Sequence, residues 1–248
     1  MLELAAKLPP GALLGSDDAS LSQALLATGG VRFLAREADL VRTEGRITGW
    51  RDSVLGVEAR AAAPNGGNSR FDAGPPAGLI CQEGVNCGFT LPGFAPEVEA
   101  FSVAVVYRSQ GDARTLASVF TGQTNNMIFL GEGEGRVLVK ERAGGLEVAL
   151  PLPKREGARL VILSFDGRTL RLEADGQEAA VTGDVPGLVH QADFFIGCRS
   201  NRPGLAKTLG ASRLQEVMFW PDRALLGSGE AEDRAALAAL RRHFRWNC

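Results

Sequence analysis

Two pairs of glutamates stand at spacings that could support acid-base chemistry. Glu97 and Glu99 form one pair, and Glu132 and Glu134 form the other. Alternate residues of a strand project to the same side, so each pair could flank a glycosidic bond, as the carboxyl groups of a retaining glycosidase do at about 5 Å. Glycines within segment 131–135 surround the second pair and favour a turn there. Solvated charge is therefore favoured over catalysis, and we expect no catalytic residue.

The patterns of metal, nucleophile and nucleotide sites do not occur in the sequence. His190 and His243 lie far apart, and there is no HExxH, CxxC or GxSxG motif. This argues against zinc hydrolysis and Ser-His catalysis. Segment 131–135 has neither the Lys-Ser/Thr of a P-loop nor the G-x-G-x-x-G spacing of a dinucleotide site. No loop of the D-x-D-x-N kind marks calcium, so no metal ligand is predicted, although calcium binding stays open, and we expect no cofactor.

Three loop segments carry amide and guanidinium side chains that suit sugar hydroxyls, namely residues 65–70, 123–126 and 199–202. Amides offer paired donors and acceptors, and arginines add charge-assisted hydrogen bonds to an acidic sugar. The alternative, that asparagine only forms the turns, stays open for each segment. We expect the ligand to contact residues of the second and third segments: Gln123, Asn125, Asn126, Arg199, Asn201 and Arg202.

Composition restricts the partners further. Among 248 residues, 27 Lys and Arg face 29 Asp and Glu, which gives a formal net charge of −2. Such a chain has no overall field for a phosphate backbone or an anionic membrane. No run approaches the roughly 18 apolar residues that span a bilayer, and the first residues lack the basic and apolar regions of a secretory signal. We expect neither nucleic-acid binding nor membrane insertion.

The cysteines leave two interpretations open. Four cysteines are too few for a disulfide scaffold in a chain of this length. Cys81 and Cys87 bracket a short loop and could either form a disulfide or remain two thiols. Cys198 and Cys248 are expected to be unpaired.

Short strands dominate the middle of the chain. Segments 101–107, 136–140 and 146–150 are β-branched or alternating and are bounded by glycine. Segment 160–181 then alternates three strand-like stretches with two Asp-Gly dipeptides, which suit type I′ turns. The sequence predicts a three-stranded antiparallel meander with turns at Asp166-Gly167 and Asp175-Gly176.

Helices are predicted near the two ends. A cap at Asp17 or Asp18 and the stop at Gly29-Gly30 predict a short surface helix. Segment 229–245 carries acidic residues in its first turn and arginines in its last, which suits the helix dipole. One apolar stripe would dock this helix on the rest of the domain: Leu237, Leu240 and Phe244.

Six segments follow one another in an order that is typical of one superfamily: Ile47–Asp52 with its Trp-x-Asp strand end, Arg70–Asp72, Phe101–Arg108, Val161–Gly176, Phe194–Gly197 and Leu214–Leu225. In this order they resemble the concanavalin A-like lectin and glucanase superfamily, and within it the laminin-G-like jelly rolls of bacterial and phage surface proteins. The resemblance covers about residues 31–244. Ala211-Ser212-Arg213 departs from it, because many members have glycine before the closing strand.

The resemblance implies an all-β fold in which two antiparallel sheets stack as a jelly-roll sandwich, with a short N-terminal helix and a C-terminal helix. No linker or repeat divides the chain, so we expect residues 1–30 to form an N-terminal extension and residues 31–248 to form one domain. Trp50 and Trp220 occupy core positions of the pattern. Glucanases of this superfamily are expected to carry a third acid after a pair such as Glu97 and Glu99, but Phe101 or Ser102 stands there.

We therefore expect a non-catalytic carbohydrate-binding or adhesion domain that recognises a bacterial cell-surface polysaccharide of anionic character. The sandwich would bring segments 123–126 and 199–202 to a common rim, and alanine at Asn125 and Asn126 would reduce binding with little change in stability. Without a signal sequence, a spike or fibre of a phage or phage-like particle, made in the cytoplasm, is favoured over an extracellular lectin. The alternatives are a structural assembly subunit that contacts other protein subunits and a glycoside hydrolase with an atypical acidic site.

Overall fold

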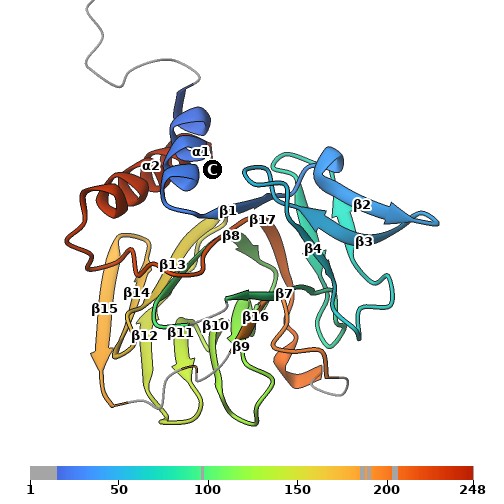
Figure 1. The fold of residues 1–248 in the computed structure, drawn as a ribbon. Coiled ribbons are helices and arrows are strands. Elements are labelled where there is room, and N and C mark those ends of the chain that lie inside the picture. Colours follow the sequence, from blue (N-terminus) through green and yellow to red (C-terminus); the bar gives the residue numbers. More distant parts are fainter. Residues whose placement is uncertain (1–15, 96–97, 185–187, 189–190, 203–205, 248) are drawn as a thin grey trace, which may run out of the picture.

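The computed structural model of the chain describes residues 16–95, 98–184, 188, 191–202 and 206–247. Two antiparallel sheets stack face to face, and helices α1 (Ser16–Ala27) and α2 (Ala231–Asn247) lie against each other over one of them (Figure 1). The all-β jelly-roll sandwich with one helix near each end, expected from the sequence, is confirmed.

The helix-covered sheet, here called sheet A, has eight strands among the described residues. Strand β1 (Val31–Leu34) pairs with one part of β17, and the remaining strands follow one another across the sheet. Their order is β15 (Gln177–Thr182), β14 (Thr169–Ala174), β13 (Arg159–Phe165), β8 (Phe101–Ser109), β17 (Ser212–Trp220), β6 (Gly78–Cys81) and β5 (Arg70–Asp72).

The second sheet, sheet B, has nine strands within the described ranges. Their order is β12 (Glu147–Pro151), β11 (Arg136–Glu141), β10 (Met127–Gly133), β9 (Ala117–Phe120), β16 (Ala192–Ile196), β7 (Phe89–Ala95), β4 (Glu58–Ala61), β3 (Arg46–Arg51) and β2 (Leu40–Thr43). Two short 3₁₀ helices, η1 (Glu37–Asp39) and η2 (Ala206–Thr208), lie in the connections before β2 and before β17.

The main core lies between the two sheets. Side chains of a strand alternate between its faces, and one set from each sheet meets in the middle. Phe219 of β17 stacks on Phe194 of β16 with ring centroids 4.1 Å apart. Trp50 is fully buried in this core, as the sequence predicts, and its indole N–H donates to the Leu34 carbonyl at 2.7 Å.

A second apolar cluster lies on the outer face of sheet A, beneath the helices. Leu237 and Leu240 of α2 and Leu21 and Leu25 of α1 are buried there against the strands and the fully buried Trp220. The predicted C-terminal helix is thus confirmed within two residues of its expected ends. The predicted N-terminal surface helix is also confirmed: Leu26 is exposed, while Leu21 and Leu25 pack on the cluster.

An ionic network fastens both helices to sheet A. Arg32 of β1 is 1% exposed; its guanidinium Nη2 donates to Glu216 Oε2 at 2.9 Å and its Nη1 to Asp18 Oδ1 at 2.6 Å. His243 Nε2 of α2 lies 2.9 Å from Glu216 Oε1. Asp18 therefore lies within α1 and binds Arg32 instead of capping the helix, and the network joins α1, β1, β17 and α2.

The Trp-x-Asp segment has a structural role at the end of β3. The carboxylate of Asp52 accepts four backbone N–H groups, from Arg32, Val54, Leu55 and Gly56, at 2.5 to 3.1 Å. A buried carboxylate that satisfies several backbone donors fixes the path of a tight loop. Asp52 therefore holds the loop after β3 against β1 and is not available to a ligand.

The two Asp-Gly turns of the meander differ. Asp175 and Gly176 both have positive φ, at 50° and 80°, as the predicted type I′ turn requires. The same prediction is wrong at Asp166-Gly167, where Gly167 alone has positive φ. There the Asp166 carboxylate accepts the backbone N–H groups of Arg168 and Thr169, and three residues instead of two connect β13 to β14.

Cys81, Cys87 and Cys198 are buried free thiols. Burial raises the pKa of the Cys81 and Cys198 thiols to about 12, which suppresses the reactive thiolate form. Of the two interpretations left open by the sequence, the structure therefore has two unlinked thiols at Cys81 and Cys87. Cys248 lies outside the described residues.

Candidate functional site

A groove of about 360 Å³ lies on the outer face of sheet B. Strands β10, β11 and β12 form its floor, where Phe129, Leu138 and Lys140 alternate with the core residues Leu130 and Val139 and so point outward. The loop before β9 and the connection between β16 and β17 supply its walls. The charged lining residues are Asp112, Arg114, Glu132, Glu134, Arg136, Lys140, Glu147, Arg199 and Lys207.

The connection between β16 and β17 is tied down onto the sheet. Ser118 Oγ of β9 donates to the carbonyls of Cys198 and Arg199 at 3.3 and 3.1 Å. Thr115 Oγ1 donates to the Thr208 carbonyl at 2.8 Å. Cys198 and Leu209 are buried in a small apolar cluster on this outer face. These contacts place the Arg199 side chain over the groove floor.

Arg199 is the central residue of the groove. Its guanidinium carbon lies 3.6 Å from the centroid of the Phe129 ring, and its Nε donates to Thr115 Oγ1 at 2.9 Å. Burial, with the nearby charge of Arg142 as a second cause, lowers the pKa of this guanidinium to about 10. Among the described residues Arg199 forms no ion pair. A partly desolvated cation without a counter-ion favours an anionic ligand.

Other cations of the groove are neutralised by the protein itself. Lys140 Nζ lies 2.9 Å from Glu147 Oε2, and Arg136 lies 3.6 Å from the other oxygen of the same carboxylate. Arg114 pairs with Glu83 outside the groove. Exposed Lys207 has no ion pair within the described ranges, and neither do the lining carboxylates of Asp112 and Glu132. The groove therefore holds unpaired charges of both signs, and Arg199 is the unpaired cation that is mostly buried.

The predicted Gln123–Asn126 segment forms a tight turn between β9 and β10. Asn125 has a φ of 63°, and the buried Asn126 side chain accepts from Thr121 Oγ1 at 2.7 Å. Gln123 is exposed, and its carbonyl accepts from the Asn126 N–H. The expected small effect of alanine on stability stays a prediction, and the hydrogen bond between Asn126 and Thr121 argues against it at that position.

The predicted common rim does not exist. In the pairing of β9 with β16, Asp193 lies opposite Phe120 and Ile196 opposite Ala117. The turn that follows Phe120 and the connection that follows Ile196 therefore leave sheet B at opposite ends. The ligand-binding set predicted from the sequence is split, and Arg199 alone among its members lines the groove.

The remaining predicted residues have structural partners or face solvent. Asn201 Oδ1 accepts the Ala63 N–H at 3.0 Å, and Arg202 is exposed beside a smaller pocket. In segment 65–70, the buried Asn65 amide donates to Ser69 Oγ and to the Gly88 carbonyl, so it shapes its own loop. Whether these residues touch a ligand stays a prediction.

Sequence reasoning missed the floor of the groove. Phe129, Leu138, Lys140 and Lys207 carry no motif, and only the alternation of β11 could have shown that Leu138 and Lys140 share a face. Which face is open depends on the stacking of the sheets and on the path of the connection after β16, and neither is readable from local pattern.

Glu132 and Glu134 do not lie together on one strand as a two-carboxylate centre would require. Glu132 lies in β10 and accepts from Ser109 Oγ at 2.8 Å, whereas Glu134 has a φ of 55° in the turn after that strand. Glu99 lies outside the strands, and Glu97 and His190 lie outside the described residues. Burial and the neighbouring Glu132 raise the pKa of Tyr107, so this phenol stays protonated.

The described residues hold neither a metal cluster nor a membrane-spanning helix. No three His, Cys, Asp or Glu side chains in the described ranges are arranged to hold a metal ion. Neither described helix is long and apolar enough to cross a bilayer.

No protein-family model matches the chain, and no curated protein gives a significant sequence match. Solved structures match it in fold. One is domain 4 of AbnA, a GH43 extracellular arabinanase from Geobacillus stearothermophilus, in complex with arabinotriose. It has a TM-score of 0.57 and 13% identity, and the alignment covers 84% of this chain and 97% of that domain.

Two other matches belong to longer proteins. A Trypanosoma rangeli sialidase in complex with sialic acid has a TM-score of 0.54 and 14% identity, and covers 86% of this chain but 33% of the sialidase. The binding domain of botulinum neurotoxin DC, in complex with rat synaptotagmin II, has a TM-score of 0.55 and 7% identity, covering 88% of this chain and 52% of the other. These likenesses confirm the jelly-roll sandwich fold; membership of the concanavalin A-like superfamily and the laminin-G-like, bacterial or phage kind stay predictions.

Proposed function

We propose that this chain is a non-catalytic carbohydrate-binding domain that holds an acidic bacterial surface polysaccharide in the groove on the outer face of sheet B. The observation that carries the proposal is Arg199, a partly buried guanidinium in a groove where it has no carboxylate partner among the described residues. A sugar carboxylate would supply the missing negative charge and could accept two hydrogen bonds from the Arg199 guanidinium.

The rest of the groove fits the same ligand. Leu138 is partly exposed on the floor and offers an apolar surface to a sugar ring, while Lys207 and the paired Lys140 stand beside it. A hydrogen bond to a charged group contributes about 1.5 to 3 kcal/mol and one to a neutral group about 0.5 to 1.5. One such site binds weakly, so useful attachment requires several copies on one carrier.

The structural neighbours support a binding role without transferring a ligand. The arabinanase domain was solved with arabinotriose, and the neurotoxin domain is itself a binding domain. The sialidase was solved with sialic acid, but this chain spans a third of that protein, so its activity is not carried over. The absence of catalysis, the contacts with other protein subunits and the location on a phage or phage-like particle stay predictions.

The test measures binding to polygalacturonate, a carboxylated polysaccharide, and to neutral dextran by affinity electrophoresis. We expect retardation by polygalacturonate only, and Arg199→Gln should weaken it about tenfold, the equivalent of one lost charge-assisted hydrogen bond. Arg168→Gln is the matched control, because Arg168 is exposed at the β13–β14 turn, away from sheet B.

Equal weakening by the control would show that net charge alone causes retardation and would overturn the proposed site. Reducing ends are measured on the same samples. A steady release of reducing ends by the wild-type chain, abolished by Glu132→Gln, would replace the binding proposal with the hydrolase alternative.

A further inference from the structure

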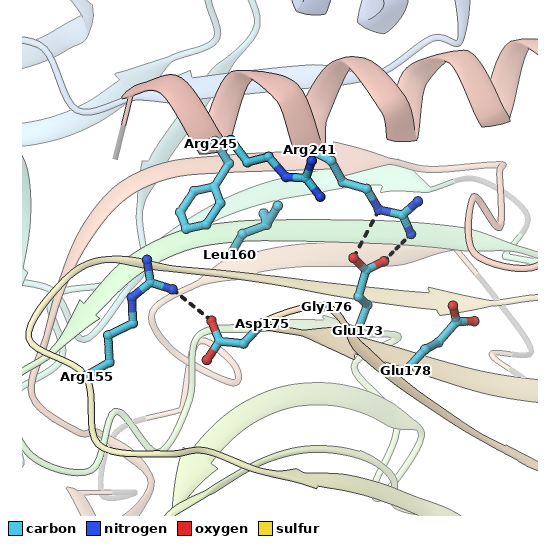
Figure 2. Close-up of a pocket in the computed structure, with 9 residues that line it drawn as sticks. Arg155, Leu160, Glu173, Asp175, Gly176, Glu178, Arg241 and Arg245 are labelled. Carbon is cyan, nitrogen blue, oxygen red and sulfur yellow. Dashed lines mark hydrogen bonds and ion pairs between the residues drawn. The ribbon is translucent and has the colours of Figure 1, made fainter.

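A cleft of about 620 Å³ lies between helix α2 and the edge of sheet A. Its position opposite sheet B separates it from the groove described above. Figure 2 shows Arg241 and Arg245 projecting from α2 toward the strands, with Arg155 at one end of the cleft and Glu178 at the other. A cavity of this size suits a ligand of small-molecule dimensions.

The carboxylates on the floor of the cleft are already occupied. Arg241 holds Glu173 with a two-point contact, in which Nε donates to Oε1 at 3.0 Å and Nη2 to Oε2. Asp175 lies between two arginines: Arg155 donates to Oδ1 at 3.1 Å, and Arg159 donates to Oδ2. The acceptors of Glu173 and Asp175 therefore have strong protein donors.

The donors of the cleft are in excess. Each arginine carries five N–H donors. Arg155 donates one hydrogen bond to Asp175, and Arg241 donates two to Glu173. Arg245 is exposed and forms no ion pair in the described part of the chain. Arg241 and Arg245 stand four residues apart on α2, which places them next to each other on one helix face.

The cleft also has an apolar wall. Phe244 lines it from the helix, and Leu160 lines it from β13. The Arg155 guanidinium carbon lies 5.8 Å from the centroid of the Phe244 ring, so a cation and an aromatic face meet at the same end. Glu178 has no ion pair among the described residues, and it stands at the opposite end, beyond Glu173 (Figure 2).

We propose that this cleft is a second binding site, for a small organic oxyanion, either a carboxylate or a phosphate monoester, that carries a ring. The oxyanion would accept hydrogen bonds from the remaining N–H groups of Arg241 and Arg245, and the ring would lie against Phe244 and Leu160. The charge of Glu178 would reject a ligand with a second negative group at the far end. This site does not depend on the polysaccharide groove.

The test is isothermal titration calorimetry of the whole chain with phenyl phosphate, benzoate and inorganic phosphate. We expect both ring-bearing anions to bind and inorganic phosphate to bind more weakly. The tighter of the two identifies the class, a phosphate monoester or a carboxylate. Failure of both to bind at millimolar concentration, or equal binding of inorganic phosphate, would overturn the proposal.

Three variants locate the site. Arg245→Gln should weaken the tighter probe about tenfold, by loss of a charge-assisted contact, and Glu178→Gln should tighten it about twofold by removing a repelling charge. Arg242→Gln, also exposed on α2 but outside the cleft lining, should have no effect. A loss in Arg242→Gln equal to that in Arg245→Gln would show general charge attraction and overturn the site. Arg199→Gln leaves this binding unchanged, so the two proposals fail separately.

Discussion

Helices α1 and α2 cover the outer face of sheet A, whereas the connection between β16 and β17 crosses the outer face of sheet B. On sheet A the outward side chains beneath the helices are mostly apolar, and the buried charges of Arg32 and Glu216 are paired with each other. On sheet B, apolar and charged side chains share the floor of a groove, and Arg199 is left without an ionic partner in the described structure.

The difference shows how one fold separates stability from binding. Sheet A is covered on its inner face by sheet B and on its outer face by the helices, so apolar side chains on both faces contribute to the hydrophobic core. The outer face of sheet B carries both apolar and charged side chains and is covered only by the connection between β16 and β17. It buries less apolar surface, but its polar groups stay accessible to solvent.

Leu240→Ala should cost about 2 to 5 kcal/mol of unfolding free energy, because Leu240 is fully buried between α2 and sheet A. Leu138→Ala should cost about 1 kcal/mol, since Leu138 is only partly buried on the groove floor. Urea denaturation followed by tryptophan fluorescence measures both. Similar costs would mean that the outer face of sheet B is as much a part of the core as the helix-covered face.

Glu216→Gln should cost about 2 to 3 kcal/mol near pH 7, since it removes the buried one of the two carboxylates that pair with the Arg32 guanidinium and leaves only the exposed Asp18. Hydrogen bonding to His243 and the charge of Arg32 outweigh burial and hold the pKa of Glu216 below its ordinary value of 4.5. As the pH falls, Glu216 is therefore protonated in the unfolded chain before it is protonated in the folded chain. The free energy of unfolding decreases from about pH 4.5 downward, until Glu216 is protonated in the folded chain as well.

Denaturation at neutral and acidic pH tests this sign. The difference in unfolding free energy between wild type and Glu216→Gln should become smaller as the pH falls through the lowered pKa of Glu216. Below that pKa both side chains are neutral. Glu178→Gln is the exposed control and should show no such narrowing. A difference that stays constant with pH would mean that the Glu216 charge does not stabilise the helices.

The β9–β10 turn should show the smallest effects. Asn126→Ala should cost about 1 kcal/mol, because a buried side chain loses its hydrogen bond with Thr121. Asn125→Gly should change stability by less than about 0.5 kcal/mol, since glycine readily adopts the φ of 63°. Thermal denaturation with polysaccharide binding on the same samples checks both. Loss of polysaccharide binding in an Asn125→Gly variant of unchanged stability would show that the β9–β10 turn contacts the ligand.

Local pattern predicted those parts of the fold that depend on neighbours in sequence. The antiparallel meander of β13, β14 and β15, the Asp175-Gly176 turn and the apolar stripe of α2 all appear as expected. The turn at Asp166-Gly167 was predicted incorrectly, because the Asp166 side chain bonds to backbone two and three residues ahead and enlarges the loop. Sequence pattern describes which dipeptides favour a turn, but side-chain hydrogen bonds select its length.

The sequence by itself determined that the chain is a β-sandwich with no global field for nucleic acid, and it marked Arg199 as a residue suited to an anionic ligand. Only the tertiary structure decided where the partners of Arg199 lie. Thr115 comes to it from a loop and Phe129 from a strand. The pairing of β9 with β16 also separated the two predicted loops. The physical reason is that strand register and layer stacking are set by long-range burial, which no local motif encodes.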